Sequence, residues 1–497
     1  MENCTAVIDI GSNSARLVIY QESSRYGFHL VCERKSKVRI GEGAYEAGGS
    51  LQPIGIHRAY LALKEFINTT KNYPVTRTFC VATSALRDAP NGVAFTQWIK
   101  KHLDLDIEII DGTKEAMFGA IAALNLLPIQ EGITVDIGGG SSDLALIKNS
   151  KIVQTYSLNI GTVRLKELFF DKNIPLADAR NFIQKELKKL PKEFQHKLAI
   201  GIGGTARTLS KGIMQSINYP LENIHAFSYR LKEYTPYFSN ISEANLNLLT
   251  YLYLPKGRFD TIREGTLIWQ EILTHLGTQK VITSGVGVRE GVFLHHFLIN
   301  SHSTFPKHIN PSIQSILDRF QTPHINTEKR KICATKLFNL FTKKQHIPKK
   351  YLKELLYAIE LSPIGYRFNI YQSSQHAFYV AMQEFNYGIT HKELVLTAML
   401  LRFEGKQLYL QEIYTQYANL LPKKKHLEIL SFIYTLVMKL YDNTAIKHFD
   451  FTLDKNILTI KAEDSLYLVE EKLQGLESPL NIEIETIDKR EIPYYAF

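Results

Sequence analysis

The sequence has few of the features that mark secreted, membrane-bound or cysteine-ligated metal proteins. Its 497 residues contain only four cysteines, Cys4, Cys32, Cys80 and Cys333, and their spacing fits neither a CxxC zinc motif nor a disulfide framework. There is no run of about 18 apolar residues, no signal peptide and no low-complexity tract. We therefore expect a cytoplasmic protein without a membrane partner, whose cysteines are packed in the core.

Charge, in contrast, is abundant and leans to the basic side. The chain has 59 Lys and Arg against 49 Asp and Glu, a formal net charge of +10. This balance favours an anionic partner, although many basic proteins have none. No nucleic-acid-binding module with its aromatic and basic signature is present, so nucleic acid is not expected as a partner. The length exceeds what one core holds and predicts three or four domains.

One motif occurs twice in the first third of the chain. Asp9-Ile-Gly-Ser-Asn-Ser14 and Asp136-Ile-Gly-Gly-Gly-Ser141 each follow an apolar run and precede another. The pattern is typical of a strand that ends in an acidic residue, a turn of small residues and a second strand running back. Glycine lets the backbone approach an anion, Ser and Asn add donors, and Asp offers an oxygen to a divalent cation. Two copies predict a cleft with one phosphate-binding hairpin on each wall.

The order of the predicted elements divides the chain into four parts. Residues 1–130 and 131–300 both contain strands mixed with helices and suggest a duplicated α/β domain. After a polar linker, residues 311–442 show consecutive amphipathic helices without strands. Residues 443–497 predict a small α+β domain.

Three shorter segments in the α/β part are also candidates for ligand binding. Thr83-Ser-Ala-Leu-Arg87 follows a short buried strand, which is where α/β sheets usually bind ligands. Asp111-Gly-Thr-Lys-Glu115 opens a helix, for which Thr113 is the predicted N-cap. Gly203-Gly-Thr205 opens another helix, whose amides and dipole suit a phosphate. Residues 242–275 are predicted to be mostly helical.

In this order, these segments and Ser284-Gly-Val-Gly-Val-Arg289-Glu-Gly resemble the exopolyphosphatase / guanosine pentaphosphate phosphatase (Ppx/GppA) family. The resemblance covers about residues 1–300 strongly and the rest more weakly. It implies the actin-like fold shared with sugar kinases and Hsp70, in which two ribonuclease H-like domains close on a cleft. It also implies an HD-like all-α domain, and hydrolysis of the terminal phosphate of inorganic polyphosphate or of pppGpp, with Mg²⁺ or another divalent cation as cofactor.

The resemblance assigns roles to single residues as well. Glu115 matches the family glutamate that positions or deprotonates the attacking water, and Arg87 matches a catalytic phosphate contact. Asp136 and Asp143 match the acidic positions around magnesium, with Asp9 acting on the metal through a water. The phosphate-binding positions are Asn13, Ser14, Arg87, Gly138, Gly139, Gly140, Ser141, Gly203, Gly204 and Thr205.

The sequence departs from the family pattern at a few positions. Lys114 stands where the family usually has Glu, and is expected either to contact phosphate or to be solvated. Asp143 also replaces a usual Glu, and its shorter side chain predicts a water-mediated metal contact. In the helical part, Ala358-Ile-Glu-Leu361 lacks the histidine of the HD pair, so no second metal site is expected there. His376 is then expected to be a packed or hydrogen-bonded residue.

Plainer explanations exist for single residues. Glu115 at a helix start suits the helix dipole, and Arg87 suits a structural ion pair. The lysine-rich stretches Lys329–Lys331, Lys343–Lys353 and Lys423–Lys425 either guide a long anion or are solvated helix faces.

Three functions remain open at this stage. We favour a phosphohydrolase acting on polyphosphate, on pppGpp, or on both. An actin-like ATPase or sugar kinase would use the same cleft but needs an adenosine pocket, for which only the 284–289 segment is available. A non-catalytic sensor of alarmone (guanosine penta- or tetraphosphate) or polyphosphate is the third. A homodimer is one candidate assembly.

Overall fold

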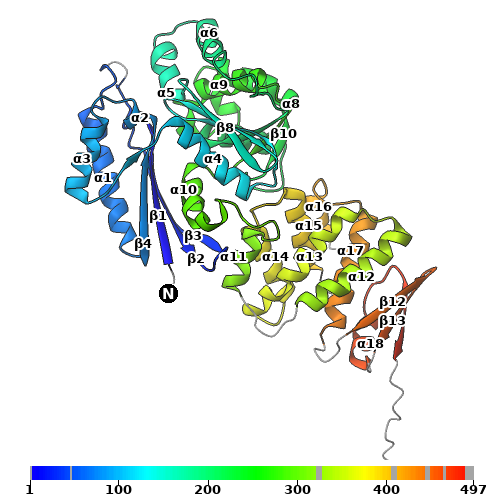
Figure 1. Cartoon of the computed structure of the whole chain (residues 1–497). Coiled ribbons are helices and arrows are strands. Elements are labelled where there is room, and N and C mark those ends of the chain that lie inside the picture. The colour runs from blue at the N-terminus through cyan, green and yellow to red at the C-terminus, as the bar shows by residue number, and fades with distance from the viewer. Residues whose placement is uncertain are drawn as a thin grey trace, which may run out of the picture. The chain divides into compact units, whose positions relative to one another are not determined.

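The computed structural model describes residues 3–44, 47–320, 327–403, 411–442, 448–462 and 466–486. The chain divides into two compact units, Met1–Ser315 and Ile316–Phe497. Figure 1 shows the mixed sheets and helices of the first unit and the mainly helical second unit. In the parts of the chain just given, no helix is long and apolar enough to cross a membrane.

The first unit begins with a five-stranded sheet whose strand order is β3-β2-β1-β4-β5. Its strands are β1 (Asn3–Ile10), β2 (Ala15–Glu22), β3 (Phe28–Ser36), β4 (Val75–Ala82) and β5 (Glu108–Ile109). The central strand β1 pairs antiparallel with β2 and parallel with β4. Residues 4–8 of β1 are all buried, as expected for an apolar strand covered on both faces.

A second, six-stranded sheet follows with the order β10-β11-β9-β6-β7-β8. Its strands are β6 (Gly132–Ile137), β7 (Ser142–Lys148), β8 (Lys151–Leu158), β9 (Leu198–Ile202), β10 (Ser228–Arg230) and β11 (Lys280–Thr283). Read from β8, the order 8-7-6-9-11 repeats the order 3-2-1-4-5 of the first sheet, and β10 is added at the edge. The duplication predicted from the two Asp-Ile-Gly motifs is therefore present in the strand topology.

Helices cover the sheets of the first unit. They are α1 (Pro53–Thr70), α2 (Ser84–Arg87), α3 (Gly92–Leu103), α4 (Gly112–Leu126), α5 (Thr162–Leu165), α6 (Leu176–Leu187), α7 (Gly203–Ser216), α8 (Leu231–Glu243), α9 (Ile262–His275) and α10 (Val288–Phe297), with a π-helical turn η1 (Lys166–Phe170) and a 3₁₀ turn η4 (Ile299–Ser301).

The prediction of a mostly helical segment over 242–275 is wrong in its first half. Between α8 and α9 the chain forms only two 3₁₀ turns, η2 (Leu248–Tyr251) and η3 (Lys256–Arg258). Leu246, Leu248 and Tyr251 are exposed there, so the apolar spacing in the sequence does not mark a buried helix face.

Two helices join the two sheets. Helix α4 follows β5 in the sequence but packs on β7 and β8, whereas α10 follows β11 and packs on α4 and β1. A side chain at Gly291 of α10 would place its Cβ 1.9 Å from the carbonyl oxygen of Phe118 in α4. Glycine is required there because the two helix backbones approach each other so closely.

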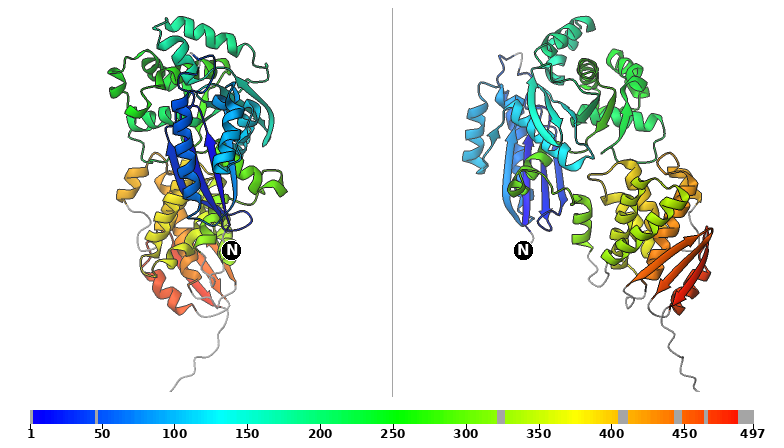
Figure 2. Two further views of the ribbon diagram at one scale, coloured as in Figure 1. Left: turned by 90° about the vertical axis from the view of Figure 1, so that its left-hand side faces the viewer. Right: turned by 45° about the vertical axis from the view of Figure 1, so that its right-hand side comes forward.

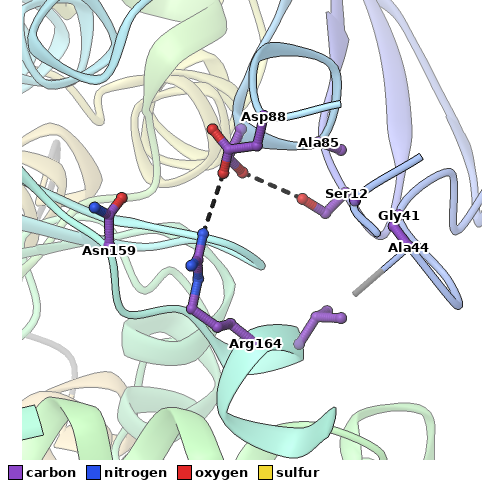
Figure 3. A pocket seen from close by; sticks show the side chains of 10 residues that line it. Ser12, Gly41, Ala44, Ala85, Asp88, Asn159 and Arg164 are labelled. Carbon is purple, nitrogen blue, oxygen red and sulfur yellow. Dashed lines mark hydrogen bonds and ion pairs between the residues drawn. The ribbon is translucent and has the colours of Figure 1, made fainter. Parts of the chain in front are cut away.

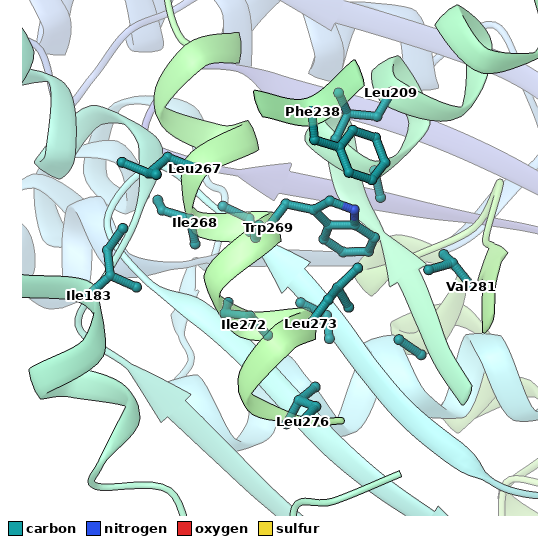
Figure 4. Packing of buried hydrophobic residues seen from close by; sticks show 14 of the residues in the cluster. Ile183, Leu209, Phe238, Leu267, Ile268, Trp269, Ile272, Leu273, Leu276 and Val281 are labelled. Atoms are coloured by element: carbon teal, nitrogen blue, oxygen red, sulfur yellow. The ribbon is translucent and has the colours of Figure 1, made fainter. Parts of the chain in front are cut away.

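The core of the second sheet's half is organised around α9. Trp269, Ile272 and Leu273 of α9 are fully buried, together with Leu209 of α7 and Phe238 of α8. Figure 4 shows these side chains gathered on one face of the sheet.

We expect Leu273→Ala to lower the free energy of unfolding by about 2–5 kcal/mol, because it leaves a cavity in this core. The matched control Val153→Ala removes an exposed side chain from β8 in the same half and should change stability by less than about 0.5 kcal/mol. Urea unfolding followed by the fluorescence of the buried Trp269 measures both. Equal effects of the two substitutions would contradict this packing.

The second unit is a helical bundle with a small sheet (Figure 2). Its helices are α11 (Pro311–Arg319, which begins in the first unit), α12 (Thr327–Gln345), α13 (Leu352–Leu361), α14 (Ser373–Glu384), α15 (His391–Arg402), α16 (Gln411–Tyr417) and α17 (Lys424–Leu440), with 3₁₀ turns η5 (Lys349–Tyr351) and η6 (Ser362–Arg367). From Ile429 to Val437 every residue of α17 is buried, which identifies it as the central helix.

The small sheet contains β12 (Phe449–Asp454), β13 (Ile457–Ala462) and β14 (Asn481–Thr486), with α18 (Tyr467–Gln474) between β13 and β14. Strands β12 and β13 form an antiparallel hairpin, and β14 pairs parallel with β13. Of the α+β domain predicted over 443–497, residues 443–447, 463–465 and 487–497 lie outside the described residues.

Several predictions fall on the helical bundle. Glu360, at the position of the HD pair, forms an ion pair with Lys331 at 3.1 Å. The ring of His376 packs against Phe368, with a centroid distance of 5.6 Å. Arg330 is buried and donates to the carbonyl of Tyr441, so it adds no exposed charge to the Lys329–Lys331 stretch.

The other two lysine-rich stretches meet in space. The rings of Tyr351 and His426 lie 6.0 Å apart, which brings Lys343–Lys353 next to Lys423–Lys425. Except for Lys353, which pairs with Glu393, the lysines of the first stretch form no ion pair with another described residue.

Candidate active site

The two Asp-Ile-Gly motifs form matching hairpin turns. The Gly11 amide donates to the carbonyl of Ser14 at 3.1 Å, and the Gly138 amide donates to that of Ser141 at 2.9 Å. The turns touch at their tips, since a Cβ on Gly139 would lie 2.7 Å from the Cβ of Ser12. The predicted arrangement of two facing hairpins is therefore present.

Each turn offers backbone amides that the described part of the chain leaves free. The N–H groups of Ser12 and Asn13 in the first turn donate no hydrogen bond to another described residue, nor do those of Gly139 and Gly140 in the second. The side chains of Asn13 and Ser14 are half-buried and likewise form no hydrogen bond within the residues described. Successive free amides in a small-residue turn suit an anion.

Four carboxylates lie close together at the base of these turns. Burial, and then the neighbouring charges of Asp143 and Asp136, raise the pKa of Glu115 well above its usual range. Burial also raises the pKa of Asp136 to about 6 and that of Asp143 to about 7. The pKa of Asp9 is raised by burial against the opposing charges of Arg289 and Arg16. The predicted acidic residues are thus brought together in one group, in which Asp143 is buried and the other three are partly buried.

Asp143 stands directly opposite Asp136 in the β6–β7 pairing. Opposite residues of an antiparallel pair point to the same face, so both carboxylates face the cleft. Ser141 donates a hydrogen bond to one oxygen of Asp143 at 3.1 Å, and Ser157 of β8 donates to the other at 2.5 Å. The sequence analysis missed Ser157, which no motif distinguishes from other serines.

Glu115 lies in the first turn of α4. Asp111, not Thr113, is the N-cap of this helix: its carboxylate accepts from the Lys114 amide at 2.7 Å, and the Thr113 hydroxyl donates to the same oxygen. The sequence analysis predicted Thr113 because it expected the helix to begin two residues later than it does. The Lys114 ammonium pairs with Glu108, so its charge is already partnered there.

Arg87 at the end of α2 links the candidate base to the opposite wall. Its guanidinium lies 3.5 Å from the Glu115 carboxylate and 3.5 Å from that of Asp88, and donates to the carbonyl of Ile110 at 3.2 Å. Asp88 in turn pairs with Arg164 of α5 at 3.1 Å. This chain of charges connects the two α/β halves.

The Asp88–Arg164 pair lines a pocket of about 410 Å³ beside the hairpin tips. Figure 3 shows Asp88 and Arg164 reaching toward each other across it, with Ser12 at its wall. The hydroxyls of Ser12 and Ser84 lie 3.2 Å apart, and Arg164 also donates to the carbonyl of Gly140 at 3.0 Å.

The predicted turn Gly203-Gly-Thr205 lies directly under Asp136. Gly203 has φ +79°, and a Cβ there would be 2.0 Å from an oxygen of Asp136, so glycine is needed for two reasons. The N-cap of α7 makes no side-chain hydrogen bond, so the first amides of this helix have no cap. Thr205 is 1% exposed and its hydroxyl faces Gly265 of α9.

A basic cluster borders this turn and was missed in the sequence. A Cβ on Gly204 would lie 3.2 Å from the Arg258 guanidinium. The pKa of Lys35 is lowered by burial and then by the charges of Arg16, Arg258 and Lys37. Only the overall positive charge hinted at such a cluster, because its members come from distant segments.

These residues fit a magnesium ion only as part of its coordination. Within the described ranges, no three His, Cys, Asp or Glu side chains are grouped so as to hold a metal by themselves. Mg²⁺ is usually bound through one or two carboxylates together with phosphate oxygens and waters. The paired Asp136 and Asp143 match that donor set.

Comparison with known proteins agrees with this geometry. A family model described as the Ppx/GppA phosphatase family matches residues 18–299. The chain belongs to the Ppx/GppA phosphatase family. A crystal structure of the Aquifex aeolicus Ppx/GppA family member is 28% identical, with a TM-score of 0.53, over 61% of this chain and 100% of that chain. The two sheets of the first unit are thus the actin-like α/β domains of this family.

Two further relatives match the same part of the chain. An exopolyphosphatase structure from Cytophaga hutchinsonii shares the fold, with 22% identity and a TM-score of 0.55 over 61% of this chain and 100% of that one. A bifunctional 3-dehydroquinate synthase/phosphatase of Fusobacterium nucleatum subsp. nucleatum is 30% identical over 56% of this chain and 44% of its own length. The chain therefore spans less than half of that curated relative.

One buried carboxylate behind the Gly203 turn makes stability depend on pH. Glu264 of α9 is 4% exposed, and one of its oxygens has no hydrogen-bond partner among the described residues. Burial raises its pKa from an ordinary 4.5 to about 7. The folded state thus holds the proton more tightly, and the cost of ionising Glu264 appears above pH 4.5 and is complete above pH 7.

We expect Glu264→Gln to remove this cost. The variant should be more stable than the wild type by roughly 2–3 kcal/mol at pH 8, and by less than about 1 kcal/mol at pH 5. Urea unfolding at a series of pH values measures the difference. A difference that stays constant from pH 5 to pH 8 would contradict the raised pKa.

Proposed function

We propose that the protein is a phosphohydrolase that releases the terminal phosphate of inorganic polyphosphate, of pppGpp, or of both. The observation that carries the proposal is the partly buried Glu115–Arg87 pair beside the aspartates of two facing turns, whose amides form no hydrogen bond with another described residue. Family membership supports a phosphatase, and the basic cluster supports a substrate with many negative charges.

The turns would hold the terminal phosphate. The backbone N–H groups of Ser12, Asn13, Gly139 and Gly140 would donate to it, and Arg87 would add a charged donor. Phosphoryl transfer needs little covalent chemistry from a protein, because positioning and neutralisation of charge supply most of the catalysis. The uncapped first turn of α7 adds further amides on the Asp136 side.

Glu115 would accept a proton from the attacking water. Its raised pKa makes the carboxylate a stronger base near neutral pH than an ordinary glutamate. Arg87 opposes this rise in pKa and so keeps part of the population ionised and the side chain oriented. The proton is taken up at a carboxylate oxygen of Glu115.

Asp136 and Asp143 would hold Mg²⁺ or another divalent cation, with Asp9 acting through water. When bound, such an ion neutralises the phosphate oxygens and relieves the repulsion between the carboxylates. Both oxygens of Asp143 already accept serine hydroxyls, which supports the water-mediated contact expected from its short side chain.

The rest of the substrate would lie along the basic cluster. In-line attack places the leaving group opposite the water and therefore away from Glu115. We propose that it lies toward Gly204, where the Arg258 guanidinium is close to the backbone. Arg16, Lys35 and Lys37 continue the positive surface from there. Both polyphosphate and pppGpp extend beyond the terminal phosphate as polyanions.

We expect Glu115→Gln to lower the rate of phosphate release by about 10²–10⁴-fold, because it removes the base but keeps the shape of the side chain. The matched control is Glu108→Gln, which removes an exposed carboxylate next to the same helix and should leave the rate unchanged. Phosphate release from long polyphosphate, together with the thermal unfolding temperature of each variant, measures this. Wild-type activity in Glu115→Gln would show that the base is assigned wrongly.

The double variant Lys35→Ala/Lys37→Ala should raise KM for long polyphosphate roughly threefold to tenfold and weaken its dependence on salt, because electrostatic guidance is lost. Tripolyphosphate, which is too short to reach beyond the turn, should be affected less. The control Lys185→Ala/Lys188→Ala removes the same charge from exposed positions at the end of α6 and should leave both KM values unchanged. If both double variants change KM for both substrates alike, the basic cluster does not guide the chain.

An actin-like ATPase or sugar kinase remains the second candidate function. The adenosine pocket would have to form at residues 284–289, but side chains from neighbouring elements already contact that segment. The Gly285 amide donates to the ring of His225 at 3.0 Å, and Arg207 donates to the Ser284 carbonyl at 2.9 Å. This packing favours the phosphohydrolase over a nucleotide-binding ATPase. A non-catalytic sensor is disfavoured by the presence of Glu115 with both aspartates.

A further inference from the structure

Arg289, Glu290 and Gly291, in the first turn of α10, take no part in the reaction proposed above, yet all three are buried. Arg289 is 7% exposed and Glu290 is 8% exposed. Charged residues are rarely buried unless they are paired, so their partners indicate what this turn does.

Both oxygens of Glu290 are engaged in hydrogen bonds. The Tyr20 hydroxyl of β2 donates to one at 2.7 Å, and the Gly287 amide donates to the other at 2.6 Å. Tyr20 belongs to the first hairpin and is fixed by its ring, which stacks on Phe293 of α10 at 4.4 Å. Glu290 therefore ties α10 to the first hairpin.

Two arginines lie near the same carboxylate. Arg207 of α7 has a guanidinium nitrogen 3.5 Å from the Cβ position of Gly287, and its Nε donates to the Ser284 carbonyl at 2.9 Å. Arg289 forms its ion pair with Glu33 of β3 at 3.4 Å. Burial works against the ionisation of Glu290, but Arg289, the Tyr20 bond and Arg207 hold its pKa below the usual range. Arg207 and Glu290 therefore hold the two ends of the 284–287 turn.

The charges of the two arginines also act on the two hairpin aspartates. The charge of Arg289 acts on Asp9 of the first hairpin, and the charge of Arg207 acts on Asp136 of the second. On the other side of α10, Gly291 permits backbone contact with Phe118, three residues after Glu115 in α4. The same turn of α10 therefore meets the first hairpin, α7 and the helix of the candidate base.

We propose that Glu290 is a positioning residue for the phosphohydrolase reaction: together with Arg207 it holds the 284–287 turn, and through Tyr20 it fixes α10 between the two hairpins and α4. This inference rests on the proposed function. Without the Glu290 carboxylate, α10 would lose its tie to the first hairpin, and α4, which packs on α10 and carries the candidate base, would shift.

The test compares Glu290→Gln with Tyr20→Phe and with the control Glu271→Gln. Glu271 of α9 pairs with Arg180 at 2.8 Å, outside the site. Relative to wild type on long polyphosphate, kcat should fall about 10–100-fold in Glu290→Gln and severalfold in Tyr20→Phe, with KM changed less than about threefold. Glu271→Gln should keep the wild-type kcat.

Tyr20→Phe keeps the proposal testable if Glu290→Gln does not fold, because this substitution keeps the ring packing and removes only the hydroxyl. If Tyr20→Phe and a folded Glu290→Gln both keep the kcat of Glu271→Gln, the positioning role is overturned. The positioning role would also be overturned if kcat fell only near a lowered unfolding temperature of the variant and returned to the wild-type value at temperatures well below that point.

A double-mutant cycle with Arg207→Gln tests the link between the two charges. The double variant Arg207→Gln/Glu290→Gln should lose no more activity than the worse single variant, because each acts through the other. Multiplying losses would contradict the link. If the wild type releases no phosphate from polyphosphate or pppGpp, the proposed function fails instead, and the same cycle read from urea unfolding midpoints still decides whether the two charges are coupled.

Discussion

Mutual repulsion between buried carboxylates is the constraint around which the first unit is built. Asp9, Asp136, Asp143 and Glu115 lie near one another and are buried or partly buried, and the charge of another member of the group raises the pKa of Asp136, of Asp143 and of Glu115. Such a group is costly to bury unless positive charge or hydrogen bonds offset it. The surrounding arginines, serines and glycines can be understood as the means of keeping it together.

The duplicated hairpins meet this constraint differently. In the first, Asp9 stands opposite Arg16, so the hairpin carries its own countercharge. In the second, Asp136 stands opposite Asp143, and the excess negative charge is balanced by serine hydroxyls and by Arg207. The duplication thus supplies two similar turns, which we propose bind phosphate, while the difference at one strand position gives the second turn a pair of carboxylates that would suit a cation.

Much of this arrangement could be predicted from the sequence, for identifiable reasons. The Asp-Ile-Gly hairpins and the segments that end in Arg87 and Glu115 could be located because short-range spacing indicates a strand, a turn or a helix start, whereas the roles of these two residues came from the family resemblance. Arg258 and Ser157 were missed because only the folded chain brings them to the cleft and nothing near them in the sequence sets them apart, and Arg207 was not singled out although it lies two residues after the predicted Gly203-Gly-Thr205 turn. The mostly helical segment expected over 242–275 is wrong in its first half because the apolar residues there are exposed, a property that spacing does not reveal.

The central claim is that this cleft places a water molecule on the terminal phosphate of polyphosphate or pppGpp, and does not serve an ATPase or a sugar kinase. The direct measurement is phosphate release by the wild-type protein from long polyphosphate, pppGpp and ATP, side by side, with and without Mg²⁺. We predict Mg²⁺-dependent release from polyphosphate, pppGpp, or both, at rates far above that from ATP. Turnover of ATP alone, or no turnover of any of the three, would contradict the account.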